Sequence, residues 1–502
     1  MPNKLRETLA QAKIAPKLFT GLFGVEVEEH RITTDGRLSR YPYPSKYASR
    51  KTHPYLQSDF TDSMLELVTE PTKGGLQAIK NLKILQQISQ EHLNKDERIW
   101  PFSMPPKLVD DDLEFAHNNF SRDWFQTYRD YLERKYGIEH EIICGTHINY
   151  SLNEDLVYSL YHEFHFNEKY PTFAAFRNAT YFKLAQSFAL YRWFFTYLFG
   201  ASPLSENHYR KLPEDLKLPV RSLRSSSLGY SNTNKEAISY DSLTAQVEQM
   251  ENYVNDGTFY SIHEFYGPVR LKGRSDDLRK MLDDGVDYLE FRAFDLDPLS
   301  RAGVSDDTLD LLELFLVYSL VTDLPSDLPK RLAESLKLNE EVALENPNEQ
   351  PDWLQTRATE LINNLHLFAE QFRAPEKYLR TLAIAEKRVA NVKLTIGAQL
   401  ASRVEDNSLV TYGLKIANDR YASFLNASQP LVAIANDYSR SAQQLIKAAI
   451  IMGIRVQLHH GFKLTMGNHH ELFEAQMNIE FPNGPEEYLR SIFAELSNPN
   501  EK

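Results

Sequence analysis

The chain has 502 residues, of which 42% are hydrophobic and 25% charged, an ordinary composition for a globular protein with one large composite domain or two packed domains. The formal net charge of −13 argues against nonspecific nucleic-acid binding, so we expect no nucleic-acid partner. Cys144 is the only cysteine, which excludes a disulfide within the chain.

The N-terminal residues are followed by no long apolar run, so we expect no signal peptide and a cytoplasmic location. The most apolar stretches, 188–199 and 309–321, are too short or too charged to cross a bilayer. We expect both to be buried helices, and no membrane partner.

The segment 24–31 predicts a strand with two different faces. Glu26 and Glu28 are two residues apart, so they point to one side of the strand, while Val25 and Val27 point to the other. Two carboxylates on one side repel each other unless a cation lies between them, and Mg²⁺ prefers such oxygen ligands. The alternative is a strand whose acidic face is simply solvated.

The other elements follow from apolar spacing and from turn residues. In chain order we expect a short helix within 1–20, a turn at 59–64, a strand at 65–69, a helix at 75–94, a loop at 96–101, a helix near 121–136, a strand at 145–152, a long helix at 171–199 ending at Gly200, an irregular stretch at 203–235, a strand at 285–294 and an almost entirely helical region at 305–452. The polar pieces 328–344 and 346–352 predict a surface excursion.

Several predicted strands share the same pattern, with one polar face and one apolar face, which is typical of an antiparallel sheet that packs on helices and lines a cavity. Singly, each polar residue has an ordinary structural explanation: a surface carboxylate, a hydrogen-bonded histidine or an ion pair within one strand. The cavity side would collect Glu26, Glu28, Glu66, His147, Glu290 and Arg292. Together, four carboxylates, an imidazole and a guanidinium favour two or three metal ions that face a phosphate, which is the chemistry of phosphoryl transfer.

Other enzyme classes lack support in the sequence. The phosphate-binding pattern G-x-x-x-x-G-K-[ST] does not occur, and neither does the nucleophile pattern G-x-S-x-G. Cys144 precedes the strand of His147, but we interpret it as a small buried residue rather than as a nucleophile.

Seven motifs occur in order along the chain: Gly-x-Glu-x-Glu at 24–28, Ser-Asp-Phe followed by Leu-Glu-Leu-Val-Thr at 58–69, Asp-Glu-Arg-x-Trp-Pro-x-Ser-Met-Pro at 96–105, Gly-x-His-x-Asn-x-Ser-Leu at 145–152, Tyr-Leu-Phe-Gly-Ala-Ser-Pro at 197–203, Ser-Leu-Arg-x-Ser-x-Leu-Gly-Tyr at 222–230 and Tyr-x-Glu-x-Arg at 288–292. Together they resemble the motifs of bacterial glutamate–cysteine ligases (γ-glutamylcysteine synthetases). The resemblance covers residues 20–320. It implies an α+β fold like that of glutamine synthetase, in which a curved antiparallel sheet lines a funnel-shaped active site, with helices outside.

The resemblance also implies roles for individual residues. One Mg²⁺ (or Mn²⁺) site would use Glu28, Asp59 and Glu66, and a second would use Glu26, His147 and Glu290. Arg292 would contact the transferred phosphate. The cysteine pocket would be formed by Tyr128, Leu132, Arg224, Tyr230 and Tyr266. No compact motif marks the adenine pocket.

The implied reaction joins the γ-carboxyl group of glutamate to cysteine through γ-glutamyl phosphate, with ATP as co-substrate, and is the first step of glutathione biosynthesis. The implied partners are these small molecules, and the chain would be a monomer or a homodimer. A related ligase with another amine or amino-acid acceptor, or a non-catalytic homologue, is the alternative. The carboxylate that Arg224 would bind favours an amino-acid acceptor.

The C-terminal region departs from this pattern. Residues 439–456 resemble the segment that precedes the ATP-grasp domain in bifunctional glutathione-synthesising proteins. We expect a catalytic core at 1–320, a helical part of the same ligase domain at 321–452, and a short tail at 453–502 with no ATP-grasp domain. The paired histidines at 459–460 and 469–470 could bind a metal, but we interpret them as the solvated edge of a hairpin.

Overall fold

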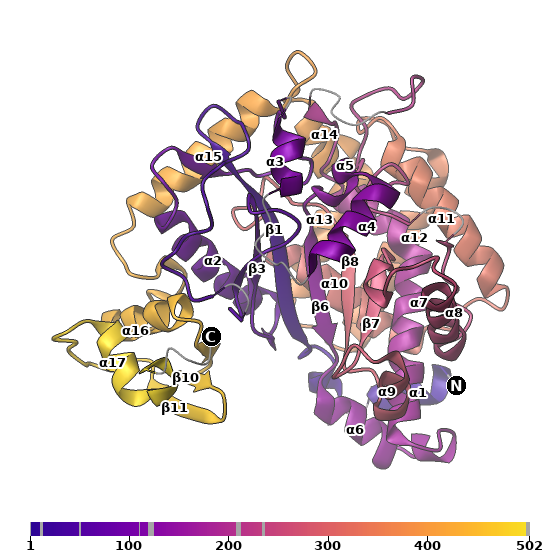
Figure 1. Ribbon diagram of the computed structural model, residues 1–502. Helices are drawn as coiled ribbons and strands as arrows, with labels where there is room; N and C mark the ends of the chain where they lie inside the picture. Colours follow the sequence, from indigo (N-terminus) through magenta and orange to yellow (C-terminus); the bar gives the residue numbers. More distant parts are fainter. Residues whose placement is uncertain are drawn as a thin grey trace.

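The computed structural model describes residues 2–10, 14–49, 52–109, 111–118, 125–206, 212–232 and 236–497. It is an α+β fold in which helices surround an eight-stranded antiparallel sheet (Figure 1), which confirms the predicted fold class. Residues 121–124 of the helix predicted near 121–136 lie outside the described residues, as do parts of the stretch predicted to be irregular.

The main sheet is built around its longest strand, β1. The strand order is β2 (Leu56–Ser58), β3 (Met64–Val68), β1 (Leu22–Thr33), β6 (Thr146–Ser151), β8 (Tyr288–Phe294) and β7 (Val269–Lys272), and β4 (Thr72–Lys73) and β5 (Glu97–Ile99) also pair with β1. Glu28 lies opposite Glu66 on β3, and Glu26 lies opposite His147 on β6. The polar residues of separate strands are therefore brought together by register.

The apolar face of the sheet packs on helices and forms the main core. Val25, Val27 and Ile148 are completely buried on this face. Behind the sheet lie α2 (Gly75–Glu91), α7 (Phe173–Phe199) and α10 (Asp306–Val321). The ring of Phe188 in α7 meets that of Phe291 in β8 edge to face, with 4.7 Å between the ring centroids. This packing fixes which way each strand faces, because a shift of one residue would turn the carboxylates into the core.

The remaining helices of the main body lie around the sheet and on the helices behind it. They are α1 (Pro2–Leu9), α3 (Asp112–Asn118), α4 (Gln126–Tyr136), α5 (Ile138–Glu141), α6 (Glu154–His162), α8 (Leu243–Asn255), α9 (Leu278–Asp284), α11 (Leu328–Leu344), α12 (Asp352–Gln371), α13 (Glu376–Ala390), α14 (Ile396–Ala401) and α15 (Val410–Leu425). Two of the helices behind the sheet begin with a side-chain cap. Thr172 Oγ1 accepts a hydrogen bond from the Ala175 N–H at the start of α7, and Ser305 caps α10 in the same way.

One sequence-based expectation was wrong, and a second was only partly right. The predicted loop at 96–101 contains β5, because the extended end of β1 offers a free edge on which Arg31 pairs with Ile99. The predicted surface excursion at 328–344 is α11, which packs along α7. Its buried Asn339 accepts a hydrogen bond from Thr196 and donates one to the Ser225 carbonyl. A polar side chain of this helix therefore faces the protein and takes part in its packing.

The C-terminal residues form a small module of their own, yellow in Figure 1. A three-stranded antiparallel sheet, β9 (Arg455–Leu458), β10 (Gly461–Met466) and β11 (His469–Glu474), lies with α16 (Arg440–Ile451) and α17 (Pro485–Ile492). His469 and His470 stand in the hairpin of β10 and β11, and the described residues place neither histidine pair in a group with metal-ligand geometry. The placement of residues 469–470 in a hairpin was therefore predicted correctly.

Among the described residues, no helix has the length and apolar character that crossing a membrane requires. The two apolar stretches noted in the sequence are parts of α7 and α10, the two core helices behind the sheet.

Candidate active site

A cavity of about 260 Å³ lies on the polar face of the main sheet. Except for Glu290 and Arg224, every residue predicted for the site lines it. The complete lining is Glu26, Glu28, Asp59, Phe60, Glu66, Phe125, Tyr128, Arg129, Leu132, Glu141, His147, Tyr230, His263, Tyr266, Arg270 and Arg292. The cavity therefore joins an acidic side, built on the strands, to an aromatic side built on α4 and on the segments around residues 230 and 266.

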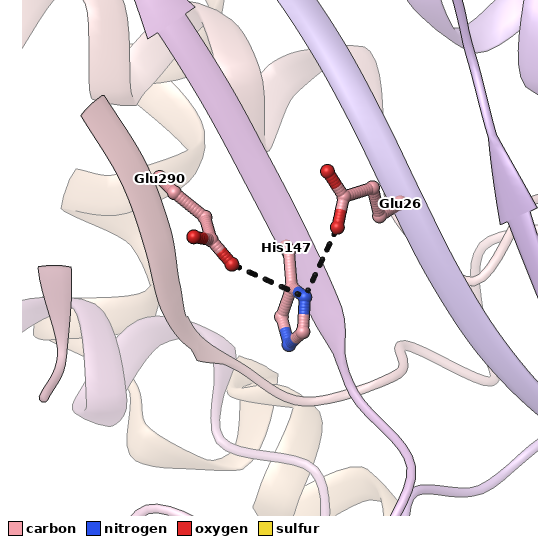
Figure 2. Close-up of side chains that lie close together, drawn as sticks. All are labelled: Glu26, His147 and Glu290. Carbon is pink, nitrogen blue, oxygen red and sulfur yellow. Dashed lines mark hydrogen bonds and ion pairs between the residues drawn. The ribbon is translucent and has the colours of Figure 1, made fainter. Parts of the chain in front are cut away.

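Three side chains from three strands converge on the acidic side (Figure 2): Glu26 from β1, His147 from β6 and Glu290 from β8. His147 Nδ1 lies 3.4 Å from Glu26 Oε2 and 3.7 Å from Glu290 Oε1. One ligand atom of each residue lies within 4.8 Å of the others, and within the described part of the chain this is the only group of three or more such residues. These spacings are compatible with a single cation between the three groups.

His147 is held as a neutral ring. Burial, and next the positive charge of Arg292, lower its pKa to about 4, so the imidazole is uncharged throughout the neutral pH range. A neutral imidazole is the form that binds metals. The pairing of β6 with β8 shifts register between Thr146 and Ile148, so the ladder on this side of β6 is irregular at His147.

Two buried polar atoms of this group have unused hydrogen-bonding capacity. Among the described residues, His147 Nε2 and Glu290 Oε2 have no hydrogen-bond partner. Buried polar atoms are normally satisfied, and orphaned ones commonly mark the place of an ion or a ligand. The chemistry of the group, two carboxylates and one imidazole, suits Mg²⁺ or Mn²⁺.

The second predicted set, Glu28, Asp59 and Glu66, lines the same cavity beside the first. Glu28 and Glu66 are direct cross-strand partners, and like charges in this position destabilise a sheet. Burial, and next the charge of Asp59, raise the pKa of Glu28 well above its usual value. His147 Nε2 is 3.6 Å from Glu28 Oε1, so the imidazole stands between the two sets.

Arg292 connects the acidic side with the aromatic side. Its Nη1 forms a hydrogen-bonded ion pair with Glu290, and its Nη2 donates to the hydroxyl of Tyr230 over 2.6 Å. Burial alone would raise the pKa of Glu290, but Arg292, Arg270 and Lys272 hold it well below its usual range. Glu290 is therefore a carboxylate at neutral pH, although the cavity lining does not include it.

The aromatic side consists of rings packed against one another. Tyr230 and Tyr266 lie 4.6 Å apart between ring centroids, and His140 stacks on Tyr230. Tyr128 stacks on Tyr260, and the cavity is completed here by Leu132 of α4. The result is a wall with an apolar surface and hydroxyl groups at defined places.

Arg224 is not among the residues that line the cavity. It is only 2% exposed, and its Nη1 donates to the Arg292 carbonyl over 2.9 Å. Its guanidinium lies across Gly145, where a Cβ atom would stand 1.9 Å from Nη2, and 5.5 Å from the centroid of the Tyr230 ring. Nε and Nη2 have no hydrogen-bond partner among the described residues.

Sequence reasoning missed three groups. Asn149 donates from Nδ2 to Glu26 Oε1 over 2.6 Å, and its place on the same strand face as His147 was a usable signal. Arg270 of β7 pairs with Glu290 in register, and Glu141 ends α5; both line the cavity, and neither lies in a motif that marks it.

Cys144 is fully buried with a free thiol. Burial, and next the charge of Glu28, raise its pKa well above the usual value. A buried thiol that stays protonated is a poor nucleophile, which agrees with its interpretation as a packing residue.

Comparisons with known proteins agree with this geometry. The family model for glutamate–cysteine ligase matches residues 7–342. A bifunctional glutathione biosynthesis protein of Streptococcus mutans is 34% identical over 90% of this chain and 59% of its own length, and one of Streptococcus agalactiae is 37% identical over 78% of this chain and 51% of its own. The chain thus spans little more than half the length of these relatives.

Two solved structures are similar in fold. A bifunctional glutathione synthetase from Pasteurella multocida matches with a TM-score of 0.84 and 28% identity, over 93% of this chain and 61% of that one. A glutamate–cysteine ligase from Francisella tularensis, solved with AMP, matches with a TM-score of 0.72 and 24% identity over 83% and 91% of the two chains. The match of the family model over residues 7–342, together with the site on the sheet, shows that this chain belongs to the glutamate–cysteine ligase family.

Proposed function

We propose that the protein joins the γ-carboxyl group of glutamate to the amino group of cysteine, with ATP as co-substrate and γ-glutamyl phosphate as the intermediate. The observation that carries the proposal is the convergence of Glu26, His147 and Glu290 beside Arg292 in one cavity. An acidic face can accept the phosphates of a nucleotide only when cations lie between them, and this face has the ligands that such cations require.

The proposed cations are Mg²⁺ or Mn²⁺, held by Glu26, His147 and Glu290 and by Glu28, Asp59 and Glu66. The fit is supported by the neutral state of His147 and by His147 Nε2 and Glu290 Oε2, which accept or donate no hydrogen bond within the described part of the chain. When bound, these ions would neutralise phosphate oxygens and make the γ-phosphorus a better electrophile.

Arg292 is proposed to bind the phosphoryl group that is transferred. Glu290 and the Tyr230 hydroxyl hold two of its nitrogens, so the guanidinium is oriented before substrate arrives. A fixed, buried cation stabilises developing negative charge more effectively than a mobile one, because it does not reorganise during the reaction.

The aromatic side is proposed to bind the acceptor. Tyr128, Leu132, Tyr230 and Tyr266 give a surface suited to a small thiol side chain. Arg224 is proposed to bind the acceptor carboxylate; the two buried guanidinium nitrogens without a partner among the described residues, Nε and Nη2, support this role. The runner-up is a ligase of the same type with another amine acceptor, which would not need Arg224.

The first prediction concerns the complete reaction. Phosphate release from ATP should require glutamate, cysteine and Mg²⁺ together, because the site holds its phosphates through cations. The measurement is phosphate release with each component omitted in turn, with identification of γ-glutamylcysteine by mass spectrometry. Undiminished turnover in EDTA would contradict the proposal, and turnover with simple amines but not with cysteine would favour the runner-up.

The second prediction concerns Asn149, which holds a proposed metal ligand without binding the metal. Asn149→Ala should raise the dissociation constant of Mn²⁺ about tenfold, because Glu26 loses the hydrogen bond that orients it. Titration followed by electron paramagnetic resonance measures this constant. Ser151→Ala, on the same strand face at the end of β6, is the control and should bind Mn²⁺ normally; equal affinities for both variants would exclude the positioning role.

The third prediction concerns Arg224. Arg224→Ala should raise the cysteine KM about tenfold to a hundredfold, since a charge-assisted contact contributes roughly 1.5–3 kcal/mol. Arg224→Lys should recover only part of this, because an ammonium group cannot form two parallel hydrogen bonds. Steady-state kinetics with cysteine and with cysteamine, which has no carboxylate, separate the roles. An equal loss with both acceptors would make Arg224 a structural residue.

A further inference from the structure

We propose that Glu141 binds the α-ammonium group of the acceptor amino acid and removes its proton before the amide bond forms. This inference rests on the proposed ligase function and names the residue that would prepare the nucleophile. Glu141 is suited to the role because it is a buried carboxylate in the cavity wall, on the side of the acceptor, and no lysine or arginine of the described residues forms an ion pair with it.

Glu141 is placed by its own short helix. It is the last residue of α5 (Ile138–Glu141), it is 6% exposed, and it lines the cavity. Its Oε1 lies 2.9 Å from Nδ1 of His140, and its Oε2 accepts a hydrogen bond from the Tyr266 hydroxyl over 3.3 Å. His140 Nε2 lies 3.2 Å from the Ser231 nitrogen, which can donate to it, and 3.3 Å from the Ser231 carbonyl oxygen.

Buried carboxylates are normally paired with a cation. The neighbouring buried carboxylate Glu264 follows this rule, since it forms an ion pair with Lys135. For Glu141, the only ion-pair contact within the described part of the chain is with the His140 ring. A cation that enters the cavity with the substrate would fill this gap, and the acceptor amino acid carries one.

The position of Glu141 also separates it from the acidic side of the cavity. Arg292 donates to Tyr230, the Tyr230 ring packs against that of Tyr266, and the Tyr266 hydroxyl donates to Glu141. Two tyrosines therefore lie between the Glu141 carboxylate and Arg292, the residue proposed to bind phosphate. An acceptor lying against these tyrosines would place its amino nitrogen between Glu141 and the acyl phosphate.

In the proposed step, the ammonium group of the acceptor gives one proton to the Glu141 carboxylate, and the freed lone pair forms the C–N bond at the γ-carbonyl carbon of γ-glutamyl phosphate. The bond between that carbon and the phosphate oxygen breaks, and its electron pair leaves with phosphate. The second nitrogen proton passes to the departing phosphate, so the products are the amide, hydrogen phosphate and the carboxylic acid of Glu141, which returns its proton to solvent.

The experiment compares two acceptors in the full-length protein. Hydroxylamine is uncharged at neutral pH and needs no base, whereas cysteine arrives as an ammonium ion. Glu141→Gln keeps the size and most hydrogen bonds of the side chain and should lower kcat/KM for cysteine by at least about a hundredfold. The rate of γ-glutamyl hydroxamate formation from hydroxylamine should stay within about threefold of that of the unmodified protein.

Glu139→Gln, a matched charge change in the same helix outside the cavity lining, should leave both rates unchanged. Glu141→Asp should restore part of the cysteine rate with an altered pH profile, and it carries the test if Glu141→Gln does not fold. Equal losses with both acceptors, or no loss with cysteine, would overturn the role of Glu141. No reaction of the unmodified protein with either acceptor would instead refute the ligase function itself.

Discussion

The central constraint on this structure is the mutual repulsion of carboxylates that the sheet brings close together. Register sets Glu28 against Glu66, and it sets Glu26 and Glu290 on either side of His147. Such an arrangement costs free energy in a buried cavity, and the packing of α2, α7 and α10 on the other face maintains it. The pKa of Glu28 is raised mainly by burial, next by the charge of Asp59, and also by that of Glu66. A site that is destabilised until positive charge arrives is well suited to bind cations and, through them, phosphate.

The second feature of the cavity is its division into two chemically different sides. Strands supply the acidic side, whereas α4, α5 and irregular segments supply the aromatic side. Arg292 bridges them, since it pairs with Glu290 and donates to Tyr230. In the proposed reaction this places the phosphate donor and the amine acceptor on opposite sides of one guanidinium group. The rigid part of the fold would then hold the nucleotide, and the less regular part would determine which acceptor is used.

Much of this architecture could be predicted from the sequence because strand alternation is a local signal. The spacing of Glu26 and Glu28, and the clean alternation around His147, are enough to indicate the polar face of the sheet. The resemblance to the family then supplied residues that alternation cannot find, such as Tyr128 in α4.

The remaining parts depend on contacts between distant segments. β5 is a strand because the end of β1 offers it an edge, and one side of α11 is buried where Asn339 meets α7 and the segment around Ser225. Glu141 and Arg270 lie in no recognisable pattern, since tertiary packing alone brings them to the cavity. The register shift at His147 is likewise a property of the pairing between β6 and β8.

In this account, divalent cations hold the acidic face together. The most direct measurement is anomalous X-ray diffraction from crystals grown with Mn²⁺ and a non-hydrolysable ATP analogue. The account predicts strong anomalous peaks between Glu26, His147 and Glu290 and beside Glu28 and Glu66, in contact with the nucleotide phosphates. Ordered nucleotide in the cavity with no anomalous peak among these residues would contradict it.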